Sequence, residues 1–284
     1  MNGLDVTSYS STRLSVFVLL LVVLALWEIF SPRRKLQHPK ARRWASNFGI
    51  SALSSAIVAL AFPLIGVGAA ILANAKGWGL FNHYEIPPLI GISLYIVAFD
   101  FAIYLQHRMF HSSRILWRLH RVHHTDLDYD VSTGVRFHPL SIGISAAIKL
   151  CLIVLLGPLA ISVLISEIVL NATSMFNHSN IKLPKQLDRI LRLIIVTPDM
   201  HRIHHSVEAN EHNRNFGFNF SWWDRLLNTY KENPAKGQEA IEIGIRGYRE
   251  DRSTGIFSLL AQPFQKDQES APNASATLAQ SPKP

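Results

Sequence analysis

Hydrophobic residues along this chain are gathered into long runs rather than into short alternating segments. Residues 14–30, LSVFVLLLVVLALWEIF, are almost uninterruptedly apolar, and further apolar regions cover residues 50–73, 88–106 and 139–175. An α-helix needs about 20 mostly apolar residues to cross a bilayer. The pattern therefore predicts an all-α integral membrane protein with about four transmembrane helices.

The last apolar region, 139–175, is interrupted at Gly157 and Pro158. Glycine and proline punctuate helices, so we expect a hairpin of two helices there, re-entrant or spanning, that begins and ends on one side of the membrane. Lys149 lies inside the first arm, where a charge is costly unless it reaches the interface or a partner.

A basic segment, SPRRKLQHPKARR at 31–43, follows the first apolar run. The positive-inside rule places this loop, taken as 31–46, in the cytoplasm. A signal peptide is the alternative for the run at 14–30, but no small-x-small cleavage pattern follows it. Counting spans from there, we expect residue 107 onward, and again residue 178 onward, on the cytoplasmic face as a helical cap.

The composition supports the membrane class, because 48% of residues are hydrophobic and only 17% are charged. The net charge of +8 is explained largely by topology, and no motif indicates nucleic-acid binding. Cys151 is the single cysteine, which excludes a disulfide framework and a cysteine-based zinc site. Any bound metal must therefore be held by histidines or carboxylates.

The chain divides into three predicted regions. Residues 1–95 form an N-terminal membrane region, 96–232 contain the histidine-rich segments and the hairpin, and 233–284 end in a tail whose composition is typical of disorder. The segment LPKQLDRILRLIIV at 183–196 has the amphipathic pattern of a helix lying along the membrane interface.

Histidines are the candidate chemistry. Eight of the thirteen fall in three clusters, and each cluster uses i, i+3 or i+4 spacing, which places side chains on one face of a helix. Two clusters share the pattern His-Arg-x-His-His. The clusters are His107 and His111 in HRMFH, His120, His123 and His124 in HRVHH, and His201, His204 and His205 in HRIHH.

Eight imidazoles exceed what one ion needs, since a four-coordinate site is complete with four ligands. We therefore expect two metal ions with open coordination positions. His138 in RFHP and His178 in FNHSN lie where the hairpin begins and ends, and both become candidate ligands. His38, His83 and His212 have no partner at ligand spacing and are interpreted as structural or surface residues.

Polar residues accompany the clusters at helical spacing. Carboxylates behind metal-binding histidines commonly accept the second ring N–H and fix the tautomer. Pairing with a nearby arginine is the alternative for these acids. The candidates around the metal ligands are Asp100, Tyr104, Glu167, Asn171 and Asp199.

The ordered series DFAIYLQHRMFH, WRLHRVHH, RFHP, NHSN, TPDMHRIHHS and NFGFNFSWWDRLLNTY resembles the fatty acid hydroxylase superfamily, which includes the sterol desaturases. The similarity covers about residues 96–230. It implies a di-iron centre in a cytoplasmic cap, with the eight clustered histidines as ligands and His138 and His178 as two more, undivided between the irons. Ser141 and Asn228 depart from the family's usual acid and glycine, and neither change removes a ligand.

The resemblance implies an O2-dependent hydroxylase or desaturase acting on a C–H bond of a membrane lipid. The chain has no flavin, haem or dinucleotide motif, so we expect a separate electron donor such as a ferredoxin or a cytochrome b5-like protein with its reductase, docked on the basic face near Arg42 and Arg43. A bacterial inner membrane is the expected location. A histidine-rich membrane metal transporter or metal-binding protein is the alternative function.

Overall fold

The computed structural model describes residues 6–250 and 254–266. Five of its helices are long and apolar enough to cross a membrane, which confirms the all-α membrane fold. The tail predicted to be disordered lies almost entirely outside the described residues. The five helices are α1 (Val6–Phe30), α2 (Lys40–Ala61), α5 (Pro88–Ser112), α7 (Pro139–Leu156) and α8 (Ala160–Asn177).

The second apolar region folds differently from the single span expected at 50–73. Helix α2 begins earlier, at Lys40, and ends at Ala61. Pro63 follows closely, and a helix rarely continues through the residue before a proline. Gly66, at φ 68°, then turns the chain into the short α3 (Val67–Ala75). Part of the basic segment therefore belongs to a helix rather than to a loop.

The predicted hairpin is present, with α7 and α8 joined by a three-residue connection. Gly157 ends α7 in the left-handed conformation, at φ 62° and ψ 49°, which glycine adopts without steric cost. A Cβ on Gly79 would lie 2.2 Å from the Gly157 nitrogen, so the backbone at Gly79 packs directly against this turn. Two glycines thus hold this end of the membrane region together.

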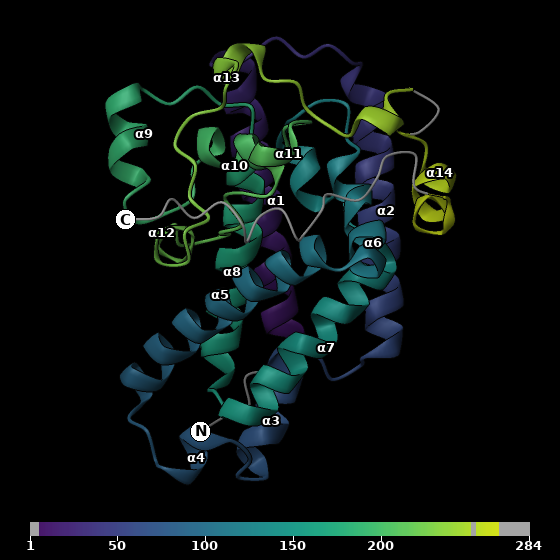
Figure 1. Ribbon diagram of the computed structural model, residues 1–284. Coiled ribbons are helices and arrows are strands. Elements are labelled where there is room, and N and C mark those ends of the chain that lie inside the picture. The colour runs from purple at the N-terminus through teal and green to yellow at the C-terminus, as the bar shows by residue number, and fades with distance from the viewer. Residues whose placement is uncertain (1–5, 251–253, 267–284) are drawn as a thin grey trace.

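Helix α8 lies at the centre of the membrane region, in contact with α1, α3 and α5, while α7 packs against α2 (Figure 1). Tyr95 and Phe99 of α5 and Val163 of α8 are almost completely buried at these contacts. Because lipid tails are as apolar as these side chains, close van der Waals packing rather than removal from water stabilises these helix contacts.

Short helices form a cap at the end of the molecule opposite α4 (Leu80–His83) (Figure 1). Helix α9 exposes Leu187 and Ile190, as the amphipathic pattern predicted, but ends at Leu191. The cap consists of α6 (Arg114–His124), η1 (Val131–Val135), α9 (Lys185–Leu191), α10 (Pro198–His204), α11 (Ala209–His212), α12 (Trp222–Leu226), α13 (Gly237–Ala240), η2 (Arg246–Tyr248), α14 (Ile256–Ala261) and η4 (Gln262–Phe264).

A buried ion-pair network fastens the cap to α2. The Arg43 guanidinium donates to both carboxylate oxygens of Asp126, at 2.7 and 2.9 Å, and to Asp130 at 2.7 Å. All three side chains are at most 2% exposed. Asn47 donates to the same Asp126 carboxylate at 3.0 Å. The loop that follows α6 is therefore held against the cytoplasmic end predicted for α2.

Candidate metal centre

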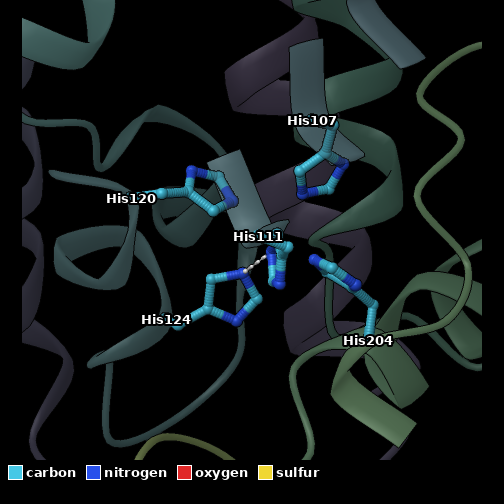
Figure 2. Close-up of side chains that lie close together, drawn as sticks. All are labelled: His107, His111, His120, His124 and His204. Atoms are coloured by element: carbon cyan, nitrogen blue, oxygen red, sulfur yellow. Dashed lines mark hydrogen bonds between the residues drawn. The ribbon is translucent and has the colours of Figure 1, made fainter. Parts of the chain in front are cut away.

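Five histidines form a first group at the junction of the membrane helices and the cap. Their candidate ligand nitrogens all lie within 4.8 Å of one another, and every residue is buried. Figure 2 shows the five rings converging on a common space. The first group consists of His107 and His111 from α5, His120 and His124 from α6, and His204 from α10.

Four further histidines form a second group, again with ligand nitrogens within 4.8 Å of one another and fully buried. His178 caps the C-terminal end of α8, which places it where the hairpin returns to the cap. The second group consists of His123, His178, His201 and His205.

Each His-Arg-x-His-His motif divides its ligands between the two groups. On α6, His120 and His124 lie one turn apart and face the first group, while His123 faces the second. The motif at α10 does the reverse, because His201 and His205 face the second group and His204 faces the first. Residues at i+3 and i+4 point to opposite sides of the residue at i around a helix, so one short helix supplies histidines to both groups.

Backbone carbonyls orient the rings. The Nδ1–H groups of His107 and His204 donate to the carbonyls of Phe216 and Arg214, each at 2.8 Å, and that of His178 donates to the Ser174 carbonyl at 2.6 Å. A carbonyl only accepts, so the proton must sit on Nδ1 and the Nε2 lone pair is free to bind a metal.

The Nε2 atoms fit two metal ions. Those of His178 and His123, and of His178 and His205, face each other at 3.1 Å, and those of His111 and His124 at 3.2 Å. Nitrogens bound to one ion at ~2.1 Å would lie about 3 Å apart at neighbouring positions. Four more Nε2 atoms are buried with no protein partner among the described residues, namely those of His107, His120, His201 and His204.

The electrostatics keep these rings neutral. Burial lowers the pKa of His120, His123 and His124 well below the ordinary value, and neighbouring imidazoles lower it further. Burial also lowers the pKa of His178, to about 3, despite its hydrogen bond to Ser174. Neutral imidazole is the form that binds metal, so near neutral pH the groups need lose no protons on metal binding.

His138 is the one predicted ligand that joins neither group. Its Nδ1 accepts from the Leu140 N–H at 3.2 Å, and its Nε2 lies 3.3 Å from the Leu260 carbonyl. Pro139 begins α7 immediately after it, so the His138 side chain turns back to cap that helix. The structure therefore brings together nine of the ten histidines and gives His138 a capping role.

Alanine substitution distinguishes a histidine that caps a helix from one that binds metal. We expect His138→Ala to retain both metal ions and to lose about 1 kcal/mol of stability with the cap, whereas His178→Ala should lose metal from the second group because it removes one of the histidines of that group. Metal analysis of the purified, iron-reconstituted proteins measures both. Equal metal loss in the two variants would make His138 a ligand.

Asp100 contacts the loop that holds a histidine ring rather than a ring itself. Asp100 accepts from the Trp223 indole N–H at 2.8 Å and from the backbone N–H groups of Asn219 and Phe220, each at 3.1 Å. It therefore fixes the loop whose Phe216 carbonyl orients His107. No histidine donates to it among the contacts of the described residues, because backbone N–H groups occupy both of its oxygens.

The other candidates around the ligands also have partners outside the two groups. Glu167 pairs with Arg13 at 2.5 Å, which is the alternative considered for the intramembrane acids. Asp199 pairs with Arg33 at 3.1 Å and with Arg202. Tyr104 bonds to the Thr229 hydroxyl at 2.8 Å. Asn171 is half-buried on α8.

Sequence reasoning missed the position of His212. Its buried ring lies against Trp117, His111 and His124, at centroid distances of 4.9, 5.5 and 5.6 Å. No local spacing links His212 to these residues, so only the fold reveals it. The orienting carbonyls of Arg214 and Phe216 were also missed, because any residue type supplies a carbonyl.

The family model of fatty acid hydroxylases matches residues 92–229. This span contains both histidine groups complete, from His107 to His205, together with the loop that orients His107. The chain belongs to the fatty acid hydroxylase family. The match makes the chain an oxidoreductase.

Three curated relatives are similar to this family member. The ornithine lipid hydroxylase OlsE of Rhizobium tropici is 27% identical over 88% of this chain and 75% of its own length. Alkylglycerol monooxygenase of Caenorhabditis elegans is 27% identical over 66% of this chain and 37% of its own, and the human enzyme 29% over 55% and 34%. The chain thus spans about a third of those longer enzymes. No solved structure matches the chain.

Proposed function

We propose that this protein hydroxylates a membrane lipid with O2 at a pair of iron ions held by the two histidine groups. The observation that carries the proposal is the set of nine buried imidazoles in two adjoining groups, with Nε2 atoms at the spacing of ligands on a shared ion. The family relatives named for lipid hydroxylation and alkylglycerol oxidation support a lipid substrate.

Iron fits the donor set. Imidazole suits iron as well as zinc and copper, and all-imidazole ligation adds no negative charge. Five histidines would hold one ion and four the other. When bound, the ions supply O2 activation for oxygen insertion into a C–H bond, and the protein's part is to hold neutral, fixed rings around them.

The chain also supplies an apolar floor between the metal groups and the membrane helices. The Phe137 ring stacks on His123 at 4.4 Å, and the Phe218 ring lies 5.5 Å from His107 and 5.9 Å from His201. Both rings pack with the apolar cluster of the membrane helices. Such a floor excludes water and favours an aliphatic substrate approaching from the lipid side.

The remaining requirements come from the chemistry of the reaction. Hydroxylation consumes O2, two electrons and two protons and yields one alcohol and one water. A separate donor, such as a ferredoxin or a cytochrome b5-like protein, supplies the electrons on this proposal. The basic segment after α1 favours a cytoplasmic cap in a bacterial inner membrane.

The proposal is tested by lipid mass spectrometry of cells that carry the gene, lack it, or carry His201→Ala. We expect a lipid heavier by one oxygen atom only with the intact gene and only under aeration. Loss of two hydrogens in place of oxygen gain would indicate desaturation instead. Identical lipids in all three strains, under conditions where the protein is made and holds metal, would contradict the proposed function.

A further inference from the structure

A basic pocket of about 660 Å³ opens in the cap beside the end of α1. We infer that this pocket is the docking site of an acidic one-electron carrier protein, an inference that rests on the proposed function. The residues that carry the argument are Arg33, Arg34, Lys35, Lys40, Asn180 and Glu239, and they are called the carrier pocket below.

The carrier pocket has an excess of positive charge. Four of its side chains are cationic, while Glu28 and Glu239 are the carboxylates in its lining. Lys40 pairs with Glu28 at 3.2 Å, and Arg33 pairs with Glu239 at 3.1 Å. The Arg34 guanidinium donates to a backbone carbonyl. Complementary charge of this kind steers an acidic protein and raises its association rate.

The lining of the carrier pocket favours a protein partner. Glu239 belongs to α13, which lies at the end of the molecule farthest from α4 and from the hairpin turn (Figure 1). Glu28 of α1 and Lys40 of α2 line the opposite side, so the pocket lies where the ends of two membrane helices meet the cap. Because the two carboxylates of the lining would repel the phosphate of a lipid headgroup, the mixed but net basic lining suits the charged surface of an acidic carrier protein better.

Two short connections lead from the carrier pocket to the second histidine group. Asn180 forms the wall and follows His178 by two residues, and its side chain and backbone are bonded to the 33–34 segment at 2.6 to 3.2 Å. Arg33 pairs with Asp199, which precedes His201 by two residues. A carrier seated here would therefore lie over the second group.

A third connection runs through buried aromatic and cationic side chains. Arg202 pairs with Asp199 and lies over the Tyr129 ring at 5.1 Å. The Tyr129 ring in turn lies 5.2 Å from His205 and 5.6 Å from His178. These contacts join the docking surface to His178 and His205, which belong to the second group.

The electron balance requires two docking events for each lipid. Each carrier molecule is oxidised by one electron. The two electrons, with two protons from water, reduce one oxygen atom of O2 to water, while the other oxygen enters the C–H bond to give the alcohol. The carrier pocket thus serves twice per turnover.

Charge reversal at Lys35 tests the inference, because Lys35 is exposed and belongs to neither histidine group. The probe is an acidic ferredoxin with its reductase, and the control is Lys76→Glu, the same charge change on an exposed lysine near α3. We expect Lys35→Glu to weaken ferredoxin binding and raise its KM about tenfold, roughly 1.4 kcal/mol, with a smaller salt dependence. Lys76→Glu should change neither.

A small reductant separates docking from chemistry. Dithionite with methyl viologen should drive hydroxylation equally in the wild-type protein and in Lys35→Glu. Unchanged ferredoxin binding and KM in Lys35→Glu would overturn the inference, as would an effect seen only with vesicles of anionic lipid and absent in detergent. If viologen supports no hydroxylation by the wild-type protein, the proposed function fails. In that case, ferredoxin that binds the wild-type protein and Lys76→Glu but not Lys35→Glu would still support the docking site.

Discussion

Replacing His124 with alanine should leave the purified protein with one bound iron instead of two and should abolish lipid hydroxylation. His124 faces His111 at 3.2 Å and lies within the first group of five. Removing its ring takes away a ligand and opens a cavity beside Trp117, whose ring packs on His124 at 5.3 Å. Loss of supporting residues alone commonly costs 10 to 100-fold in metal affinity or activity, so we expect a loss of more than ~100-fold for a ligand.

Metal analysis and Mössbauer spectroscopy of iron-reconstituted protein measure the number of bound irons. Lipid turnover measures the loss of hydroxylation. His83→Ala is the matched control, since His83 is exposed at the end of α4. It should retain two irons and full turnover. Two irons and normal turnover in His124→Ala would show that the first group is not a metal site.

Replacing Arg43 with alanine should have the largest effect on stability. It would leave the Asp130 carboxylate buried without its cation and the Asp126 carboxylate with Arg136 alone, at 3.9 Å. Breaking a buried pair in this way costs about 3–5 kcal/mol. Arg43 holds the pKa of Asp126 well below its usual range, so the free carboxylate would be strongly disfavoured in the folded cap. The docking role expected from the sequence for Arg43 is wrong, because its side chain is only 2% exposed.

The adjacent Arg42 supplies the control, because it is exposed. Arg42→Ala should change stability by less than about 0.5 kcal/mol. Thermal unfolding in lipid nanodiscs, followed by loss of intact protein after brief proteolysis, measures both variants. If Arg43→Ala and Arg42→Ala unfold at the same temperature, the ion-pair network does not hold the cap on α2.

The membrane helices and the histidines that lie together in the two groups were largely readable from the sequence. Long apolar runs have few alternatives to a membrane helix, and the spacing of His120, His123 and His124 places them on a short helix whatever surrounds it. His178 lacked such local support, but it lies at the end of the predicted hairpin, and the topology predicted that it would lie near the other clusters; its place in the second group was not predicted.

Other features depended on contacts that no local pattern encodes. The division of each His-Arg-x-His-His motif between the two groups requires the relative rotation of α6 and α10. His138 has the same imidazole as the ligands, yet Pro139 makes it a helix cap. The carboxylates expected to hold the rings, such as Asp100, instead hold a loop whose carbonyl does so. Tertiary packing decided each of these cases.

The most direct test of the central claim uses isotopically heavy O2. The purified, iron-reconstituted protein is supplied with total membrane lipid, ferredoxin and its reductase, and the product lipid is analysed by mass spectrometry. We expect one heavy oxygen atom in each product molecule and none from water, with no product in His124→Ala. A protein that carried iron across vesicle membranes while leaving every lipid unchanged would contradict the account and would favour a metal transporter.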